Sequence, residues 1–266
     1  MDPLVEESEG LMRKLATVAV AAAQISWSVP AYSGPQCEAG QNFGAVDISY
    51  QVNDTFLRNI KSIGVSTIIR YYDWKEETLP GKTMTRTELA SIRNNGLSVA
   101  VVFQHHNDSV KTFETAERGA IDAERSLELA GHFKQPAGSA IYFGVDGVDE
   151  KFLSEFRKGR RGADDKFGLR LIKRYFQDVS SVFRAKYALY SIGVYGSGLV
   201  CREIVDAGLA KYCWLANATS WPEYDLFEKT KRWNLKQLLP TKGCFGEEVD
   251  LNIVNTSSRA FGQWRP

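Results

Sequence analysis

The stretch AIYFGVD, residues 140–146, decides the fold of this chain. A short, uninterrupted apolar run of this kind predicts a buried strand. An amphipathic helix is predicted before it, over residues 113–133, and another after it, over residues 165–184. A strand that alternates with amphipathic helices is typical of βαβ units, and these units build a parallel sheet.

The same alternation extends outward from this stretch in both directions. Further helices are predicted over residues 52–63, over residues 85–94 behind the capping box Thr85-x-x-Glu88, and in a segment that ends near Gly208. After Gly208 the strands follow one another too closely for full crossover helices. The predicted strands are Phe43–Ile48, Ser66–Arg70, Ser98–Gln104, Ala140–Asp146, Ser191–Tyr195, Tyr212–Ala216, Arg232–Gln237 and Glu248–Asn252. About five βα units followed by three strands with short connections predict an α/β fold, a distorted TIM-type barrel.

The composition is that of an ordinary globular protein. The chain has 266 residues, of which 44% are hydrophobic and 24% charged, and barrels of about 250 residues are usually one domain. The formal net charge of +1 argues against nucleic acid or an anionic membrane as the partner. One basic run, residues 157–161, is followed by Asp164 and Asp165 and is interpreted as a solvated loop, with a phosphate contact as the alternative. We expect a monomer.

The N-terminal 33 residues read as a leader and signal peptide. Met12 opens a short cationic segment, residues 15–23 form an apolar segment too short to span a bilayer, and Ala31-Tyr32-Ser33 is a small-x-small cleavage site. Translation then starts at Met12, and a single domain covers residues 34–266. The alternative is an amphipathic helix at the start of an intracellular protein. The signal peptide predicts a secreted or cell-envelope protein without a transmembrane segment.

Export would place the four cysteines in an oxidising compartment, where an even number favours disulfides. Three pairings are possible. Closure of a barrel would bring the segment before the first strand beside the segment before the last, which favours Cys37–Cys244 and leaves Cys201–Cys213 to join a helix to the next strand. The spacings match no zinc pattern, so we expect neither a metal nor another cofactor.

Polar residues stand at the ends of the predicted strands, where barrel enzymes carry their active sites. Each has a structural explanation when taken singly: Asp47 could cap a helix, Arg70 could pair with a carboxylate, and Gln237 could bind backbone groups. The set is Asp47, Arg70, Gln104, Asp146, Tyr195, Asn217, Gln237 and Asp250, with aromatic residues such as Trp214 beside them. Together these residues predict a sugar-binding site.

Three carboxylates and an arginine around one mouth suit glycosidic cleavage. The reaction needs an acid that protonates the leaving oxygen and a second group that stabilises the oxocarbenium-like centre or activates water. Two of the carboxylates could divide these roles if burial raises the pKa of one of them.

The motifs after Phe43 resemble a known family. They are Arg70-Tyr-Tyr, the Gly96-Leu turn, the helix with Asp122-Ala123, Ile141 to Asp146, Ile192 to Gly198, Gly208-Leu-Ala, Trp214-Leu-Ala, Gln237, Val249-Asp-Leu-Asn252 and Phe261-Gly-Gln-Trp264. In order and spacing they are similar to a glycoside-hydrolase-like barrel domain known from a mycobacterial exported envelope protein.

That family in turn resembles the family-25 glycoside hydrolases, lysozymes that cut peptidoglycan. The resemblance implies that Asp47, Asp146 and Asp250 correspond to carboxylates of the lysozyme site. It also exposes a departure, because the presumed proton donor of the lysozymes is a glutamate two residues beyond the fourth-strand aspartate. Here that position is Val148, and Asp149 is the nearest replacement.

Three functions follow from this reading. The first is a muramidase-like hydrolase of cell-wall glycan, with Asp146 as the acid, Asp47 or Asp250 as the second carboxylate and Arg70 orienting the substrate. The second is a catalytically inactive envelope protein that binds glycan in the same cleft, an alternative suggested by Val148. The third is a glycosidase of a different polysaccharide.

Overall fold

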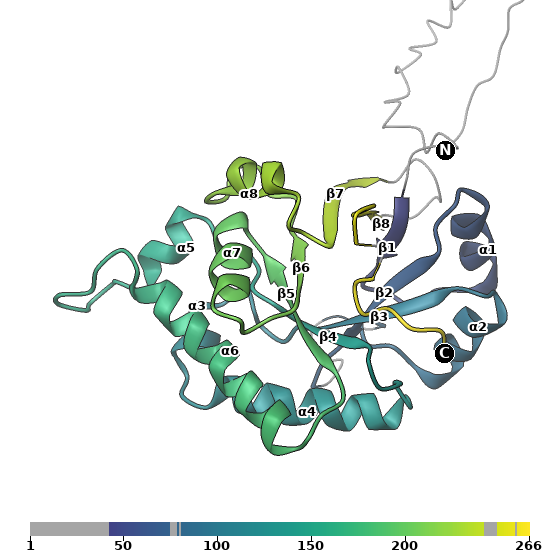
Figure 1. The fold of residues 1–266 in the computed structure, drawn as a ribbon, viewed down its shortest axis with the longest axis horizontal. Coiled ribbons are helices and arrows are strands. Elements are labelled where there is room, and N and C mark those ends of the chain that lie inside the picture. Colours follow the sequence, from purple (N-terminus) through teal and green to yellow (C-terminus); the bar gives the residue numbers. More distant parts are fainter. Residues whose placement is uncertain (1–42, 75–78, 80, 242–248, 259) are drawn as a thin grey trace, which may run out of the picture. The chain divides into compact units, whose positions relative to one another are not determined.

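The computed structural model describes residues 43–74, 79, 81–241, 249–258 and 260–266. Within them, eight strands close into one barrel in chain order, and helices flank it (Figure 1). The strands are β1 (Phe43–Asp47), β2 (Thr67–Tyr72), β3 (Ser98–Phe103), β4 (Ala140–Gly144), β5 (Ser191–Gly196), β6 (Tyr212–Leu215), β7 (Leu235–Thr241) and β8 (Val249–Val254). The predicted TIM-type barrel is confirmed.

Strand β8 differs from the others in direction. Neighbouring strands from β1 to β7 are parallel, whereas β8 is antiparallel to both β7 and β1. Asp250 therefore lies at the start of its strand and not at the end, which corrects the sequence-based placement. Because β8 is reversed, its start lies at the end of the barrel where β1 finishes, and Asp250 is in register with Asp47.

The helices confirm the alternation and correct some of its details. They are α1 (Asp54–Ser62), α2 (Arg86–Asn94), α3 (Val110–Glu114), α4 (Arg118–His132), α5 (Glu150–Glu155), α6 (Phe167–Ala185), α7 (Gly198–Asp206) and α8 (Tyr224–Thr230). The helix predicted over residues 113–133 is two helices, because Thr115 is extended and Glu117 has a left-handed backbone with φ of 60°. The short helices α5 and α8 were missed, since segments of six or seven residues give a weak periodic signal.

Two apolar clusters hold the barrel together. Residues inside it pack around Tyr142 and Trp214, whose rings meet edge to face at 6.2 Å. A larger cluster packs the outward side chains of the strands against the helices. Alternate residues of each strand therefore belong to different clusters, as the pleat of a strand requires. In β2, Ile69 faces the interior and Ile68 the helices.

The predicted capping box of α2 is present. Thr85 accepts a hydrogen bond from the backbone N–H of Glu88, and the Glu88 side chain accepts one from the backbone of Thr85. Glu88 is only 4% exposed, because its carboxylate also pairs with Arg70 on β2. One glutamate thus fixes the start of the helix and anchors it to the barrel wall.

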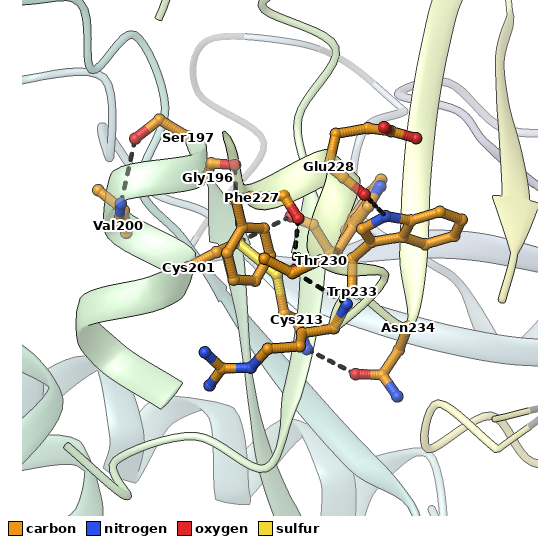
Figure 2. The surroundings of a disulfide bond; sticks show 12 residues. Gly196, Ser197, Val200, Cys201, Cys213, Phe227, Glu228, Thr230, Trp233 and Asn234 are labelled. Carbon is orange, nitrogen blue, oxygen red and sulfur yellow. Dashed lines mark hydrogen bonds between the residues drawn. A yellow bond between two sulfur atoms is a disulfide. The ribbon is translucent and has the colours of Figure 1, made fainter. Parts of the chain in front are cut away.

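The disulfide predicted between Cys201 and Cys213 is confirmed; it joins α7 to β6 (Figure 2). Beside it, the backbone N–H of Cys213 donates to the Asn234 side chain at 2.9 Å. The other predicted pair, Cys37–Cys244, and the predicted leader lie outside the described residues. None of the described helices is long and apolar enough to cross a membrane.

Candidate active site

A pocket of about 100 Å³ opens at the mouth of the barrel, where β1 to β7 end and β8 begins. It is lined by Tyr71, Val102, Gln104, Asp146, Tyr195, Trp214, Gln237 and Asp250. Six of these eight are residues that the sequence assigns to the site: Gln104, Asp146, Tyr195, Trp214, Gln237 and Asp250. The structure therefore brings most of the strand-end residues together, with two carboxylates among them.

On the β8 side of the mouth, amide side chains surround a pair of carboxylates. The Gln237 amide lies 3.0 Å from Asp250 Oδ2 and 3.4 Å from each oxygen of Asp47. The Asn252 amide donates to Asp47 Oδ2 at 2.7 Å, and the Tyr71 hydroxyl to Asp47 Oδ1 at 3.3 Å. Asp47 is 3% exposed and does not line the pocket. It therefore supports the mouth from behind.

The position of Asp47 affects its ionisation. Burial raises the pKa of the Asp47 carboxyl well above its usual range, and the nearby charge of Asp250 raises it further. The hydrogen bonds from Asn252, Gln237 and Tyr71 oppose this rise. Because like charges at close range cannot both ionise cheaply, the neighbouring carboxyl disfavours the ionised form of Asp47.

Asp146 stands on the opposite side, just beyond β4. Its Oδ2 accepts a hydrogen bond from the Gln104 side chain at 3.1 Å, and its Oδ1 accepts one from the backbone N–H of Gly147 at 2.9 Å. Burial raises the pKa of Asp146, the Gly147 hydrogen bond lowers it, and the negative charge of Asp108 raises it. The net direction is upward, which suits a carboxyl that must hold a proton near neutral pH.

Aromatic side chains form much of the remaining lining. The Tyr195 ring lies 4.5 Å from the Trp214 ring, and the Tyr195 hydroxyl donates to Gln237 Oε1 at 3.0 Å. The Trp214 indole N–H donates to Asn252 at 2.7 Å. Tyr71 is one of the aromatic residues that the sequence places at the strand ends, and it lines the pocket. Asn252 was not assigned to the site from the sequence. It could have been found by strand alternation, because it shares a face of its strand with Asp250.

The assignment of Arg70 to substrate binding is corrected. Its side chain is fully buried on the outer side of β2. There its guanidinium pairs with Glu88 at 2.7 Å and donates to the backbone oxygens of Ile48 and Gly81. The alternation of the strand explains the result, since Ile69 and Tyr71 face the interior and Arg70 between them must face outward.

The region after β4 shows why the family-25 glutamate has no counterpart here. Gly147 adopts a left-handed backbone with φ of 69°, and Val148 behind it is fully buried in the outer apolar cluster. Asp149 caps α5 by accepting the backbone N–H of Phe152 at 2.6 Å. Neither Val148 nor Asp149 therefore lines the mouth pocket.

Asn217, the last of the predicted site residues, lies beside the pocket. Asn217 contributes its backbone N–H to Gln237 Oε1 at 3.4 Å, and it is not among the lining residues. Among the described residues, no group of three His, Cys, Asp or Glu side chains is arranged to hold a metal ion.

The closed barrel and its carboxylate-lined mouth define a glycoside hydrolase-like domain. The family model of the Rv2525c-like, glycoside hydrolase-like domain matches residues 58–256. The chain belongs to this family.

Individual proteins share sequence or fold with this chain. The chain is 30% identical over 171 residues to the uncharacterized protein YbfG of Bacillus subtilis, which is 61% of this chain and 21% of that protein. It thus spans about a fifth of that relative's length. A crystal structure of the Tat-secreted protein Rv2525c of Mycobacterium tuberculosis matches 84% of this chain and 99% of that one, with a TM-score of 0.60 and 22% identity. An uncharacterized B. stearothermophilus protein matches 83% of this chain and 99% of that one, with a TM-score of 0.55 and 15% identity.

Proposed function

We propose that this domain hydrolyses cell-wall glycan, in the manner of a muramidase, by carboxylate acid/base chemistry at the barrel mouth. The observation that carries the proposal is that Asp146 and Asp250 line one pocket in different surroundings. Asp146 is held by one side-chain amide and a backbone N–H, and its pKa is raised. Asp250 is beside an amide donor and a second carboxyl, Asp47.

The two carboxyls divide the work between them. Asp146 donates its proton to the glycosidic oxygen as the bond to the sugar breaks, while Asp250 stabilises the positive charge that develops on the sugar or activates the attacking water. Asp47 contributes indirectly, because a protonated Asp47 leaves Asp250 free to ionise. Tyr195 offers an apolar face to the sugar ring, and the buried Trp214 ring packs beside it.

The same domain fits a second function, namely glycan binding without hydrolysis. The observation that favours it is the burial of Val148 in the outer cluster, which leaves the mouth without the proton donor of the family-25 lysozymes. In that case Asp146 and Asp250 would accept hydrogen bonds from sugar hydroxyls. The ligand would be retained and not cut.

We also propose that the protein is secreted or held at the cell envelope. One support is the signal-peptide pattern of residues 12–33. The other is the similar protein Rv2525c, which is a Tat-secreted protein. Cleavage after Ser33 would be visible as a mature N-terminus at Gly34 by mass spectrometry of the exported protein.

The release of reducing ends from purified peptidoglycan separates the two functions. Hydrolysis predicts release by the protein and a loss of about 100-fold or more in Asp146→Asn, because general acid catalysis contributes at least that much. Asp165→Asn, which changes a 90%-exposed aspartate outside the pocket, is the matched control and keeps full activity. Retention of peptidoglycan without any release would establish the binding function.

A further inference from the structure

The mouth pocket is too small to hold a glycan by itself. Its volume of about 100 Å³ is well below the range of about 300–1,000 Å³ that is usual for small-molecule sites. It can enclose the reacting part of one sugar, so further sugars of the chain must bind elsewhere on the surface. A second pocket of about 510 Å³ falls within that range, and Tyr71 contributes to the lining of both pockets.

This second pocket, the Trp74 groove, lies between the end of β2, the segment before α2 and one side of α4. Its lining combines aromatic, apolar and charged side chains. They are Tyr71, Tyr72, Asp73, Trp74, Thr83, Met84, Arg125, Glu128, Leu129, His132 and Phe133. Apolar faces beside a few polar groups are the usual composition of a small-molecule site.

Trp74 is held rigidly in the groove. Its indole N–H donates to Asp122 at 3.0 Å, and Asp122 is fully buried and further fixed by the Tyr175 hydroxyl at 2.9 Å. The backbone N–H of Trp74 donates to Asp73 at 2.6 Å. Trp74 nevertheless remains partly exposed. A fixed, partly exposed indole offers a flat apolar surface to the C–H face of a pyranose ring at little cost in side-chain entropy.

Arg125 supplies a positively charged guanidinium beside this ring. Its guanidinium lies 5.8 Å from the centre of the Trp74 ring. Its Nη1 contacts Glu128, which is 68% exposed. Its Nη2 reaches the backbone oxygen of Trp74 at only 3.4 Å. Its buried Nε has no hydrogen-bond partner among the described residues. This Nε is closed to solvent, but the pair with Glu128 is exposed and therefore weak, so the terminal N–H groups can turn to a ligand carboxylate, which accepts two of them at once.

We propose that the Trp74 groove binds a carboxylate-bearing sugar of the glycan, with its ring on Trp74 and its carboxylate on Arg125. The proposal rests on the proposed function for the choice of glycan, in which a muramic acid unit without a stem peptide carries the free carboxylate. The groove then selects acidic over neutral amino sugars, and it positions the chain for the carboxylates of the mouth.

The test is isothermal titration of the full-length protein with two disaccharides, the neutral N-acetylglucosamine dimer and N-acetylglucosaminyl-N-acetylmuramic acid. We expect the acidic disaccharide to bind about tenfold more tightly, since a charged hydrogen bond of this kind has that effect. Arg125→Gln abolishes the preference, Arg125→Lys restores part of it, and Trp74→Leu weakens binding of both disaccharides.

The matched control is Arg170→Gln, because Arg170 also sits beside an aromatic ring, 5.6 Å from that of Phe167, but outside the groove. It keeps the full preference. The proposal would be overturned if the two disaccharides bound with equal affinity or if neither bound. It would also be overturned if the preference survived Arg125→Gln. Tighter binding of a sugar-free stem peptide would also overturn it, because the carboxylate would then come from the peptide.

The outcome is independent of hydrolysis. Asp146→Asn leaves the Trp74 groove intact, so this variant keeps the preference for the acidic disaccharide even though reducing-end release is lost. A protein that shows the preference but never releases reducing ends would refute the hydrolytic function and retain the groove. A protein that releases reducing ends but shows no preference would support the hydrolytic function and refute the proposal for the groove.

Discussion

The two sides of the barrel mouth hold their carboxylates in opposite ways. On the β8 side, Asp47 is buried behind the pocket and contacts three side-chain donors, Gln237, Asn252 and Tyr71. On the β4 side, Asp146 lines the pocket and contacts one side-chain donor, Gln104. The comparison shows that residues of one type, all at the same end of one barrel, differ in accessibility and in the ease with which they ionise.

The largest expected effect separates the two carboxyls of the β8 side. Asp250→Asn lowers kcat on peptidoglycan by about 100-fold or more, because Asp250 lines the pocket in which the proposed reaction takes place. Asp47→Asn lowers kcat by less than about tenfold, since it replaces a group that favours the protonated form with a neutral one of the same shape. Equal losses in the two variants would show that Asp47 takes part in the chemistry directly.

Stability measurements extend the comparison to the two glutamines. Gln237→Leu removes the amide shared by Asp47 and Asp250 and also leaves the Tyr195 hydroxyl without its acceptor, so we expect a loss of about 3 kcal/mol in the free energy of unfolding. Gln104→Leu removes one hydrogen bond to a partly exposed carboxyl and costs about 1 kcal/mol. Urea denaturation measures both, and similar values for the two variants would contradict the asymmetry.

The pH dependence of stability tests the ionisation of Asp47. Because burial and Asp250 raise its pKa in the folded state, the folded protein holds this proton more tightly than the unfolded chain does. The resulting stabilisation is complete below the unfolded pKa of about 3.9 and is lost as the pH rises through the folded pKa. The slope is at most about 1.4 kcal/mol per pH unit. Asp47→Asn flattens the curve of unfolding free energy against pH, whereas Asp165→Asn leaves it unchanged.

The smallest expected effect concerns Asp146. The Gln104 hydrogen bond lowers the pKa of this carboxyl, so Gln104→Leu raises it. Because the acid must be protonated to act, the fall of kcat/KM at high pH moves upward, by less than about one pH unit. A pH–rate profile of the variant measures this shift, and a fall that moved to lower pH would exclude Asp146 as the acid.

Much of the fold could be read from the sequence, because buried parallel strands and amphipathic helices leave strong periodic signals. The strand within the stretch that ends at Asp146 was placed correctly for this reason. The pair Cys201–Cys213 was reached differently, as the pair left over when barrel closure was used to join the other two cysteines. The direction of β8 could not be read, since the alternation of a strand is the same in either direction. Asp250 reached the mouth only because the strand is reversed.

The site was harder to predict because it depends on which face of a strand a residue occupies. Arg70 was assigned to the mouth by its place at a strand end, although its neighbours Ile69 and Tyr71 show that it faces outward. Val148 differs, because simple alternation from Asp146 would turn it inward. The left-handed backbone at Gly147 breaks the alternation and sends Val148 into the outer cluster. Such a turn depends on tertiary packing and leaves no clear periodic signal.

The division of roles at the mouth is tested most directly by carboxyl ¹³C NMR of the aspartate-labelled protein over a pH titration, with Asp47→Asn to assign the key resonance. We predict a carboxyl resonance that titrates clearly above the ordinary range of aspartate and disappears in Asp47→Asn. If the Asp47 carboxyl titrated like an exposed aspartate, the account of a protonated support behind the working carboxylates would be wrong.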